Sequence, residues 1–302
     1  MENLDNKTCI ERIEIKGLWG RFDVNWALHP DVNILVGENG TGKSTILLNL
    51  LALLRTRPFI QKYIYSERVN LYFKVGGVSQ NIKRHINRIA NSVGEKGYGT
   101  MDKSLENVIL CDYVNTFDKD LFEKNEWDKK NKPFIITHLD KELDELIDDY
   151  VDYQLSQTKK IINGKQQPEA VFAKNKYFIE TINRFFKHTD KRVDETENRL
   201  SFLLNDDTKL KAYDLSSGEK QLLIILLKVL CQDEKPTVLL LDEPEISLHL
   251  RWQYELIEII RTINPNCQVI IATHSPSLFT NGWRDHIFWM SKICEEKEAV
   301  EA

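Results

Sequence analysis

Residues 37–44 of this 302-residue chain read Gly-Glu-Asn-Gly-Thr-Gly-Lys-Ser. They satisfy the pattern G-x-x-x-x-G-K-[ST] and join one apolar segment, residues 32–36, to another, residues 45–54. A glycine-rich turn between a buried strand and a buried helix directs backbone N–H groups and the helix N-terminus toward a phosphate. This feature predicts an α/β fold with a Walker A phosphate-binding loop.

The residue types in this loop predict a nucleotide site for ATP and Mg²⁺. Lys43 would supply a cation to the β- and γ-phosphates, and the Ser44 hydroxyl would bind Mg²⁺. The residues expected to bind the nucleotide are Asn39, Gly40, Thr41, Gly42, Lys43, Ser44 and Thr45.

A second apolar run, residues 237–241, ends in the adjacent carboxylates Asp242 and Glu243. A buried strand that ends in this way has the form of a Walker B motif. Asp242 would contact Mg²⁺, and Glu243 would polarise the attacking water as a general base. An acidic pair before Pro244 is by itself an ordinary turn. Its position downstream of a phosphate-binding loop favours the catalytic interpretation.

Two further segments lie near the ends of apolar elements. Residues 215–221, Leu-Ser-Ser-Gly-Glu-Lys-Gln, precede an apolar helix, where small residues expose helix N-terminal amides to an anion. Alone, this segment reads as a helix cap. His274 follows the apolar run 269–272, so we expect it at the same sheet edge as Lys43 and Glu243, where it would sense the γ-phosphate.

Hydrophobic periodicity predicts the remaining organisation. We expect half-buried antiparallel strands early in the chain, an amphipathic helix from residue 138 and a second helix from Pro168 to about Phe186. Strand, helix and strand over residues 237–274 predict a parallel sheet. Further strands are expected at residues 68–78 and 106–115. The predicted fold is therefore a P-loop NTPase with a central, mostly parallel sheet, an antiparallel β subdomain and a helical insertion.

We expect three consecutive segments in the chain. They are the N-terminal part of the ATPase lobe at residues 1–115, a helical insertion at residues 116–193 and the C-terminal part of the lobe at residues 194–302.

Composition bears on the cellular location of the protein, the state of its cysteines and its capacity to bind nucleic acid. The opening residues contain no apolar signal region and no later run reaches about 18 apolar residues, so we expect a cytoplasmic protein without a membrane partner. The five cysteines are interpreted as reduced core residues. A net charge of −5 gives no overall footprint for nucleic acid. The basic residues available for a local nucleic-acid contact are Lys83, Arg84, Arg88 and Lys96.

Four segments resemble the motifs of ABC-type ATPases and occur in the same order. Along the chain they are the Walker A loop, LSSGEKQ, LLLDEPEISLH and ATHSP. The resemblance is to the soluble heads of SMC proteins, of DNA-repair ATPases and of the OLD, Septu and PARIS-like defence ATPases. It implies that Ser217 and Gly218, with Ser216 and Glu219 beside them, reach across a dimer to the γ-phosphate on the other subunit. It also implies that Ser247, Leu248 and His249 form the D-loop.

The sequence departs from the family pattern in two places. No Q-loop glutamine is evident, and the junction Tyr-Val-Asn-Thr-Phe at residues 113–117 leaves Asn115 as the candidate for contacting Mg²⁺ or water. The insertion is too short for the long coiled coil of SMC arms. We also expect no fused nuclease after the ATHSP segment, in contrast to OLD proteins.

These observations leave three hypotheses. The first is an ATP-hydrolysing switch that dimerises around ATP and controls a separate effector, such as a nuclease or toxin, in bacterial anti-phage defence. The second is a DNA-repair or chromosome-maintenance ATPase that binds DNA. The third is a nucleotide-dependent scaffold in which hydrolysis is incidental; Glu243 and His274 argue against it, because both serve hydrolysis.

Overall fold

The structure, a computed structural model, describes residues 8–55, 66–85, 109–115, 120–121, 136–164 and 167–297. Its described residues form two compact units. The first unit takes in segments within Met1–Asn115, Lys235–Glu243 and Asn266–Ala302, and the second takes in segments within Thr116–Glu234 and Pro244–Pro265. These units cut across the three predicted segments, because residues 194–234 and 244–265 belong with the helices of the second unit.

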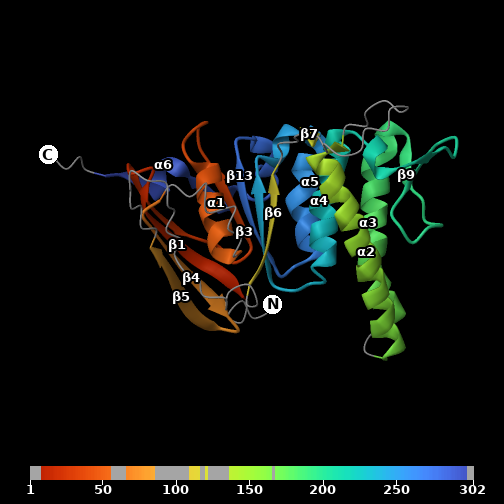
Figure 1. Ribbon diagram of the computed structural model, residues 1–302, viewed down its shortest axis with the longest axis horizontal. Coiled ribbons are helices and arrows are strands. Elements are labelled where there is room, and N and C mark those ends of the chain that lie inside the picture. The colour runs from red at the N-terminus through yellow and green to blue at the C-terminus, as the bar shows by residue number, and fades with distance from the viewer. Residues whose placement is uncertain are drawn as a thin grey trace. The chain divides into compact units, whose positions relative to one another are not determined.

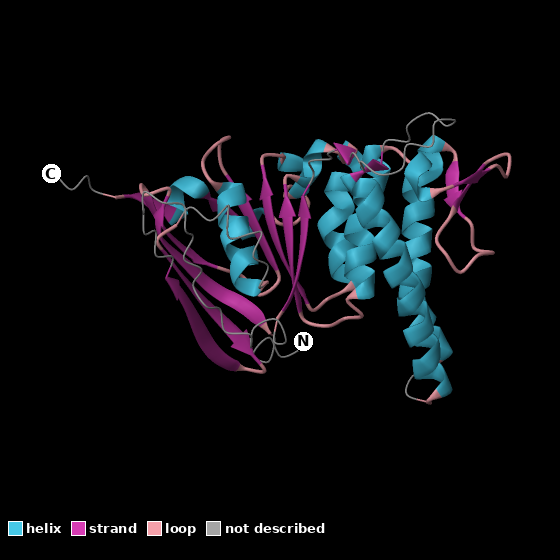
Figure 2. Cartoon of the chain, viewed as in Figure 1, coloured by secondary structure: helices cyan, strands magenta, loops and turns pink. Residues whose placement is uncertain are grey.

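The centre of the first unit is a five-stranded parallel sheet in the order β14-β3-β13-β12-β6. Figure 2 shows these strands in magenta. Strands β3, β12 and β13 are buried along their whole length, as expected for continuously apolar strands covered on both faces. The strands are β3 (Val32–Val36), β6 (Leu110–Asn115), β12 (Thr237–Asp242), β13 (Cys267–Thr273) and β14 (Ile287–Trp289).

The same unit contains an antiparallel sheet in the order β15-β2-β1-β4-β5. Helix α1 (Lys43–Leu54) lies between the two sheets (Figure 1), and its Leu47 and Leu50 share one buried core with Trp26 and Leu240. The strands of this sheet are β1 (Cys9–Leu18), β2 (Phe22–Ala27), β4 (Arg68–Val75), β5 (Val78–His85) and β15 (Cys294–Glu296), and α6 (Met290–Ile293) precedes β15. The fold class predicted from the sequence is confirmed.

Several local expectations need correction or fall outside the described residues. The strand predicted over residues 68–78 ends at Val75, because Gly76 and Gly77 take positive φ values of 54° and 86° and turn the chain into β5. Of the cysteines, Cys231 and Cys294 are only half-buried, and burial raises the pKa of the Cys294 thiol to about 11. Arg88, Lys96 and the side chain of Arg84 lie outside the described residues.

The second unit is built mainly from helices α2 (His138–Ile162), α3 (Pro168–Phe186), α4 (Ser217–Cys231) and α5 (Leu250–Ile263). Helix α2 begins at a capping box between Thr137 and Asp140, and α3 begins at Pro168, whose missing N–H costs nothing at a first helical position. The two helices were predicted from the sequence, and α3 ends at Phe186 as expected.

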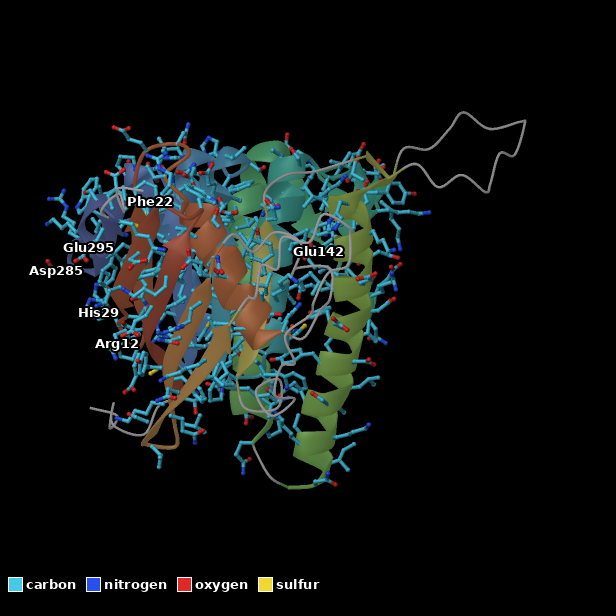
Figure 3. All side chains as sticks on the ribbon, turned by 60° about the vertical axis from the view of Figure 1, so that its left-hand side comes forward. Arg12, Phe22, His29, Glu142, Asp285 and Glu295 are labelled. Atoms are coloured by element: carbon cyan, nitrogen blue, oxygen red, sulfur yellow. The ribbon has the colours of Figure 1, made fainter. Side chains whose placement is uncertain are left out.

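Ion pairs hold α2 to α4 within the second unit. Glu142, which projects from α2 in Figure 3, lies 2.9 Å from Lys228, and Asp140 lies 2.6 Å from Lys220. These pairs join α4 to α2 at two points along the helices. Short elements complete this unit: β7 (Asp120–Leu121), β8 (Ile136–Thr137), η3 (Lys187–Thr189), β9 (Lys191–Val193), β10 (Phe202–Leu204), β11 (Lys209–Leu210), η4 (Ala212–Asp214) and η5 (Pro244–Ile246).

Candidate functional site

The predicted phosphate-binding loop joins β3 to α1. Gly42 caps the helix with φ 102°, in the left-handed region that favours glycine. A Cβ atom at this position would lie 3.0 Å from the Trp19 ring, so the sequence also needs glycine for space. Thr41 Oγ1 donates to the Glu38 carbonyl at 2.8 Å, whereas Asn39 and Gly40 are exposed. The loop therefore presents its backbone to solvent at a helix N-terminus.

Lys43 is buried at this helix N-terminus, with 4% of its surface exposed. Its Nζ donates to the carbonyls of Gly37 at 2.9 Å and Glu38 at 3.1 Å. A buried cation beside the positive end of a helix dipole favours an anion at this point. Lys43 and the loop amides thus fit a phosphate group.

Ser44 and Asp242 form a pair of oxygen donors at the start of α1 and the end of β12. Ser44 Oγ donates to Asp242 Oδ1 at 2.8 Å. Burial raises the pKa of Asp242, and the negative charge of Glu243 adds to that effect, so a cation here would offset both. Mg²⁺ prefers oxygen ligands and usually keeps one or two carboxylates plus phosphates and waters. The pair fits Mg²⁺ held together with a nucleotide, and the described residues contain no cluster of three or more acidic, cysteine or histidine ligands.

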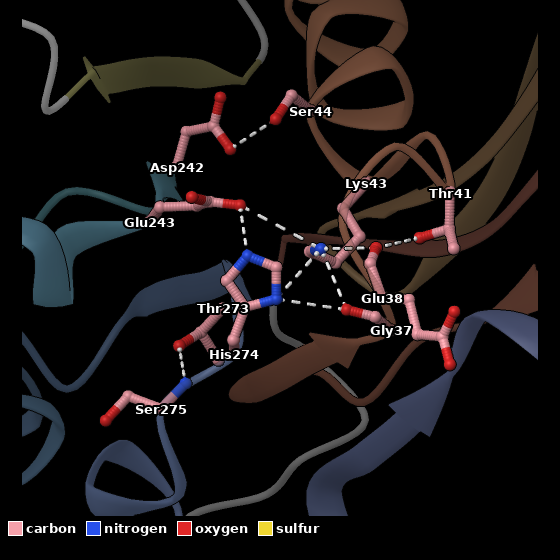
Figure 4. Close-up of polar contacts among 10 residues, drawn as sticks. All are labelled: Gly37, Glu38, Thr41, Lys43, Ser44, Asp242, Glu243, Thr273, His274 and Ser275. Atoms are coloured by element: carbon pink, nitrogen blue, oxygen red, sulfur yellow. Dashed lines mark hydrogen bonds and ion pairs between the residues drawn. The ribbon is translucent and has the colours of Figure 1, made fainter.

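Glu243, His274 and Lys43 meet beside this pair (Figure 4). His274 Nε2 lies 2.8 Å from Glu243 Oε1, and Lys43 Nζ lies 3.9 Å from the same oxygen. His274 Nδ1 lies 3.3 Å from Lys43 Nζ and 3.1 Å from the Gly37 carbonyl. Two protonation states satisfy these contacts: a neutral imidazole that accepts from Lys43, or an imidazolium that donates to Gly37. In both, Nε2 lies beside the Glu243 carboxylate.

Glu243 takes a strained backbone conformation. Its φ is 49°, in the left-handed region that non-glycine residues rarely adopt, and its N–H donates to the Ala272 carbonyl at 2.8 Å. This bond between the ends of β12 and β13 turns the chain sharply after Asp242 and directs the Glu243 carboxylate to His274. Pro244 then begins η5.

Residues at the end of β6 complete this edge of the sheet. Asn115, the candidate for the missing glutamine, is exposed and is the register partner of Asp242. Tyr113, for which the sequence motifs predict no role, donates from its hydroxyl to Asp242 Oδ2 at 3.3 Å. Burial and the negative charge of Asp242 raise the pKa of this phenol. Period-two alternation along β6 places Tyr113 and Asn115 on one face, and that signal was available in the sequence.

The predicted signature segment lies in the second unit. Ser216 caps α4: its Oγ accepts from the Glu219 N–H at 3.3 Å, and Glu219 Oε2 accepts from the Ser216 N–H at 2.8 Å. Glu219 is fully buried and also accepts from Thr189 at 2.7 Å and from Lys191 at 3.0 Å. Burial by itself raises the pKa of Glu219, but these hydrogen bonds outweigh it and the pKa is lowered. Glu219 is thus engaged inside the unit, whereas Ser216 and Ser217 are exposed.

The predicted D-loop lies directly beside the predicted signature segment in the second unit. A Cβ atom on Gly218 would lie 2.4 Å from the Ser247 carbonyl oxygen, so these backbones touch. His249 caps α5 and accepts from the Arg251 N–H at 3.3 Å. The two segments border a cavity of about 760 Å³. It is lined by Arg184, Phe185, His188, Thr189, Ser216–Glu219, Ser247–His249, Arg251, Trp252 and Glu255.

The fold and the first unit's site define a P-loop NTPase with a fold like that of SMC heads. A solved structure of an SMC head bound to the C-terminal winged-helix domain of ScpA matches with a TM-score of 0.51 and 16% identity, covering 90% of this chain and 91% of that chain. This likeness is one of fold.

Sequence comparison then shows the family. Residues 113–280 match the family described as "AAA domain, putative AbiEii toxin, Type IV TA system", and the chain belongs to this family of ATPase domains. The matched region includes Asp242, Glu243 and His274 but not the predicted phosphate-binding loop, residues 37–44.

Two curated relatives match over shorter regions. The "Retron Vc95 probable ATPase" of Vibrio cholerae serotype O1 biovar El Tor is 27% identical over 42% of this chain, and the match spans 27% of that protein. The "DNA double-strand break repair Rad50 ATPase" of Thermoplasma volcanium is 28% identical over 38% of this chain and 14% of that protein. The chain thus corresponds to about a quarter or less of these relatives. Among the described residues, no helix has the length and apolar character needed to cross a membrane.

Proposed function

We propose that the protein is a Mg²⁺-dependent ATPase head that dimerises around ATP. The observation that carries this proposal is the convergence of Lys43, Glu243 and His274 beside the Ser44–Asp242 pair. A buried cation at a helix N-terminus, two oxygen donors for Mg²⁺ and a carboxylate held by histidine are the groups that phosphoryl transfer to water requires.

Each residue then has a role in the proposed reaction. Lys43 and the loop amides bind the β- and γ-phosphates, and Ser44 and Asp242 hold Mg²⁺, which supplies neutralising charge. Glu243 accepts the proton of the attacking water, and His274 holds the Glu243 carboxylate and contacts the γ-phosphate. Asn115 contacts Mg²⁺ or water from the neighbouring strand.

The second half of each site comes from a second copy of the chain. Ser217 and Gly218 of one copy would contact the γ-phosphate bound to the other, with the Ser247–His249 loop at the interface. Support comes from the exposed position of Ser216 and Ser217 at the N-terminus of α4 and from the resemblance to paired ATPase heads. Glu219 supports this segment from inside.

Mixing two inactive variants tests the composite site. Lys43→Ala damages the phosphate-binding loop and leaves the signature intact, whereas Ser217→Arg does the reverse. In an equal mixture, half of randomly paired dimers are mixed and each holds one intact site, so about a quarter of the natural ATPase rate should return. A mixture no more active than the sum of its parts overturns the two-copy site.

We propose further that this ATPase acts in the bacterial cytoplasm and controls a separate effector in defence against phages. The match to a retron-associated probable ATPase supports this role. The test is phage plating on bacteria that carry the gene with its native neighbours, comparing the natural sequence with Lys43→Ala. Protection that depends on Lys43 is expected, and equal plating of both strains contradicts the defence role.

The match to a Rad50 ATPase favours DNA binding as the second candidate function. Duplex DNA binding that requires ATP and weakens steeply between 50 and 200 mM salt would support it, because each neutralised phosphate releases counterions. Absence of binding at low salt with ATP and Mg²⁺ present excludes it.

A further inference from the structure

Tyr113 is placed at the Mg²⁺ side of the proposed site by elements that pack tightly. Its ring lies against the core of the first unit, and its backbone pairs with Leu240 on β12. Arg55, at the C-terminus of α1, donates to the Cys111 carbonyl at 2.7 Å and to the Asp112 carboxylate at 3.0 Å. Helix α1 is therefore tied to β6 at one end, while Ser44 reaches Asp242 at the other.

Asp242 is held through both of its carboxylate oxygens. Ser44 donates to Oδ1 at 2.8 Å and Tyr113 donates to Oδ2 at 3.3 Å. A carboxylate on a single-bonded side chain rotates freely unless its oxygens are held, because its terminal torsion is broad. Two hydroxyl donors from different elements, α1 and β6, therefore fix the plane of the Asp242 carboxylate.

We propose that Tyr113 is a positioning residue for Mg²⁺: its hydroxyl orients the Asp242 carboxylate so that Oδ1 faces Ser44, and Ser44 and Asp242 would together hold the ion. The proposal rests on the proposed ATPase function. Partners that orient metal ligands change metal affinity by about 10- to 100-fold when they are removed. The Tyr113–Asp242 separation is long for a hydroxyl donor. We therefore expect an effect near the lower end of that range.

Tyr113→Phe removes the hydroxyl and keeps the ring that packs on the core. Tyr72→Phe is the matched control, because the Tyr72 hydroxyl also donates to a carboxylate of the first unit, Glu14 Oε2, at 3.1 Å. Each variant is titrated with Mg²⁺ at a fixed concentration of a fluorescent ATP analogue, and nucleotide binding is also measured without Mg²⁺.

For Tyr113→Phe, the Mg²⁺ concentration at half-maximal nucleotide binding should rise about 10-fold, and excess Mg²⁺ should restore binding. Without Mg²⁺, the variant should bind the nucleotide with the same affinity as the natural protein. Such binding also shows that the variant is folded. An unchanged Mg²⁺ midpoint, or an equal loss of binding with and without Mg²⁺, overturns the positioning role. If the natural protein shows no Mg²⁺-dependent nucleotide binding, the proposed function itself fails, and that result is distinct from a failure confined to Tyr113→Phe.

Discussion

His274 Nε2 lies 2.8 Å from Glu243 Oε1, across the ends of two neighbouring parallel strands. Glu243 directly follows β12 and His274 directly follows β13, and Asp242 and Ala272 are register partners near the ends of these strands. Because parallel strands end at the same edge of a sheet, residues 31 positions apart meet at one point. In the proposed reaction, this contact orients the carboxylate that accepts the proton of water.

His274→Ala should slow ATP hydrolysis while preserving ATP binding. Without the imidazole, Glu243 loses its 2.8 Å partner, and we expect kcat to fall about 10- to 100-fold with the ATP Kd changed less than about 3-fold. Phosphate release and nucleotide titration measure the two quantities. His286→Ala is the control, since His286 pairs with a carboxylate of the same unit, Asp31, at 3.5 Å. Equal losses of kcat in both variants contradict a specific role for His274.

Lys43→Ala should weaken nucleotide binding itself. Lys43 is the buried cation of the loop, and its removal takes away a charge-assisted bond to phosphate, so the ATP Kd should rise about 10-fold or more. Lys228→Ala is the control, because it removes another largely buried lysine that lies 2.9 Å from Glu142. An ATP affinity that is the same in Lys43→Ala and in the control argues against the proposed phosphate site.

Glu219→Gln should destabilise the protein in a pH-dependent way. The folded-state pKa of Glu219 lies below its ordinary value of 4.5, so the stabilisation from its charge is fully present above that pH and is lost as pH falls through the folded value. At pH 7 the loss should be about 2 kcal/mol, because Lys191 loses its buried partner.

Urea unfolding between pH 7 and 3.5 measures how much less stable Glu219→Gln is than the natural protein. The difference in unfolding free energy between Glu219→Gln and the natural protein should narrow below pH 4.5. Glu258→Gln, on the exposed face of α5, is the control and should change stability by less than about 0.5 kcal/mol. A gap that stays constant over this pH range shows that the ionised carboxylate is not the stabilising species.

Gly218→Ala should disturb the contact between the predicted signature segment and the predicted D-loop. The new Cβ would lie 2.4 Å from the Ser247 carbonyl oxygen, so one backbone has to shift, at a cost of about 1–3 kcal/mol in unfolding free energy. Ser217→Ala, one residue earlier on an exposed position, should cost less than about 0.5 kcal/mol. Thermal or urea unfolding of the two variants checks the difference, and equal stability means that the two segments are not in fixed contact.

Continuous apolar runs made the parallel sheet and α4 predictable, and Pro168 gave the start of α3. These elements carry strong local signals, since a run of residues such as Leu239, Leu240 and Leu241 is compatible with few environments. The glycine pattern also located the loop that joins β3 to α1.

The ion pairs, the grouping of the helices and the contact of Tyr113 could not be predicted, because they join segments far apart in the sequence. Local patterns do not encode such contacts. Lys191 and Glu219 belong to elements 28 positions apart, and their ion pair shows only when α4 is placed beside β9. The ion pairs of Lys220 and Lys228 likewise show only when α4 is placed beside α2. Tyr113 contacts Asp242 from 129 positions away, so its role needed the register between β6 and β12.

The central claim is that ATP joins two copies of the chain and that Glu243 is needed to hydrolyse it. The most direct test is the molecular mass of the protein in solution. The measurement uses Mg²⁺ with and without ATP, for the natural protein and for Glu243→Gln, alongside phosphate release. The amide preserves the shape of the side chain but cannot take a proton, so the variant should accumulate ATP-bound dimers while only the natural protein releases phosphate. Monomers of both proteins under every condition would contradict the two-copy site.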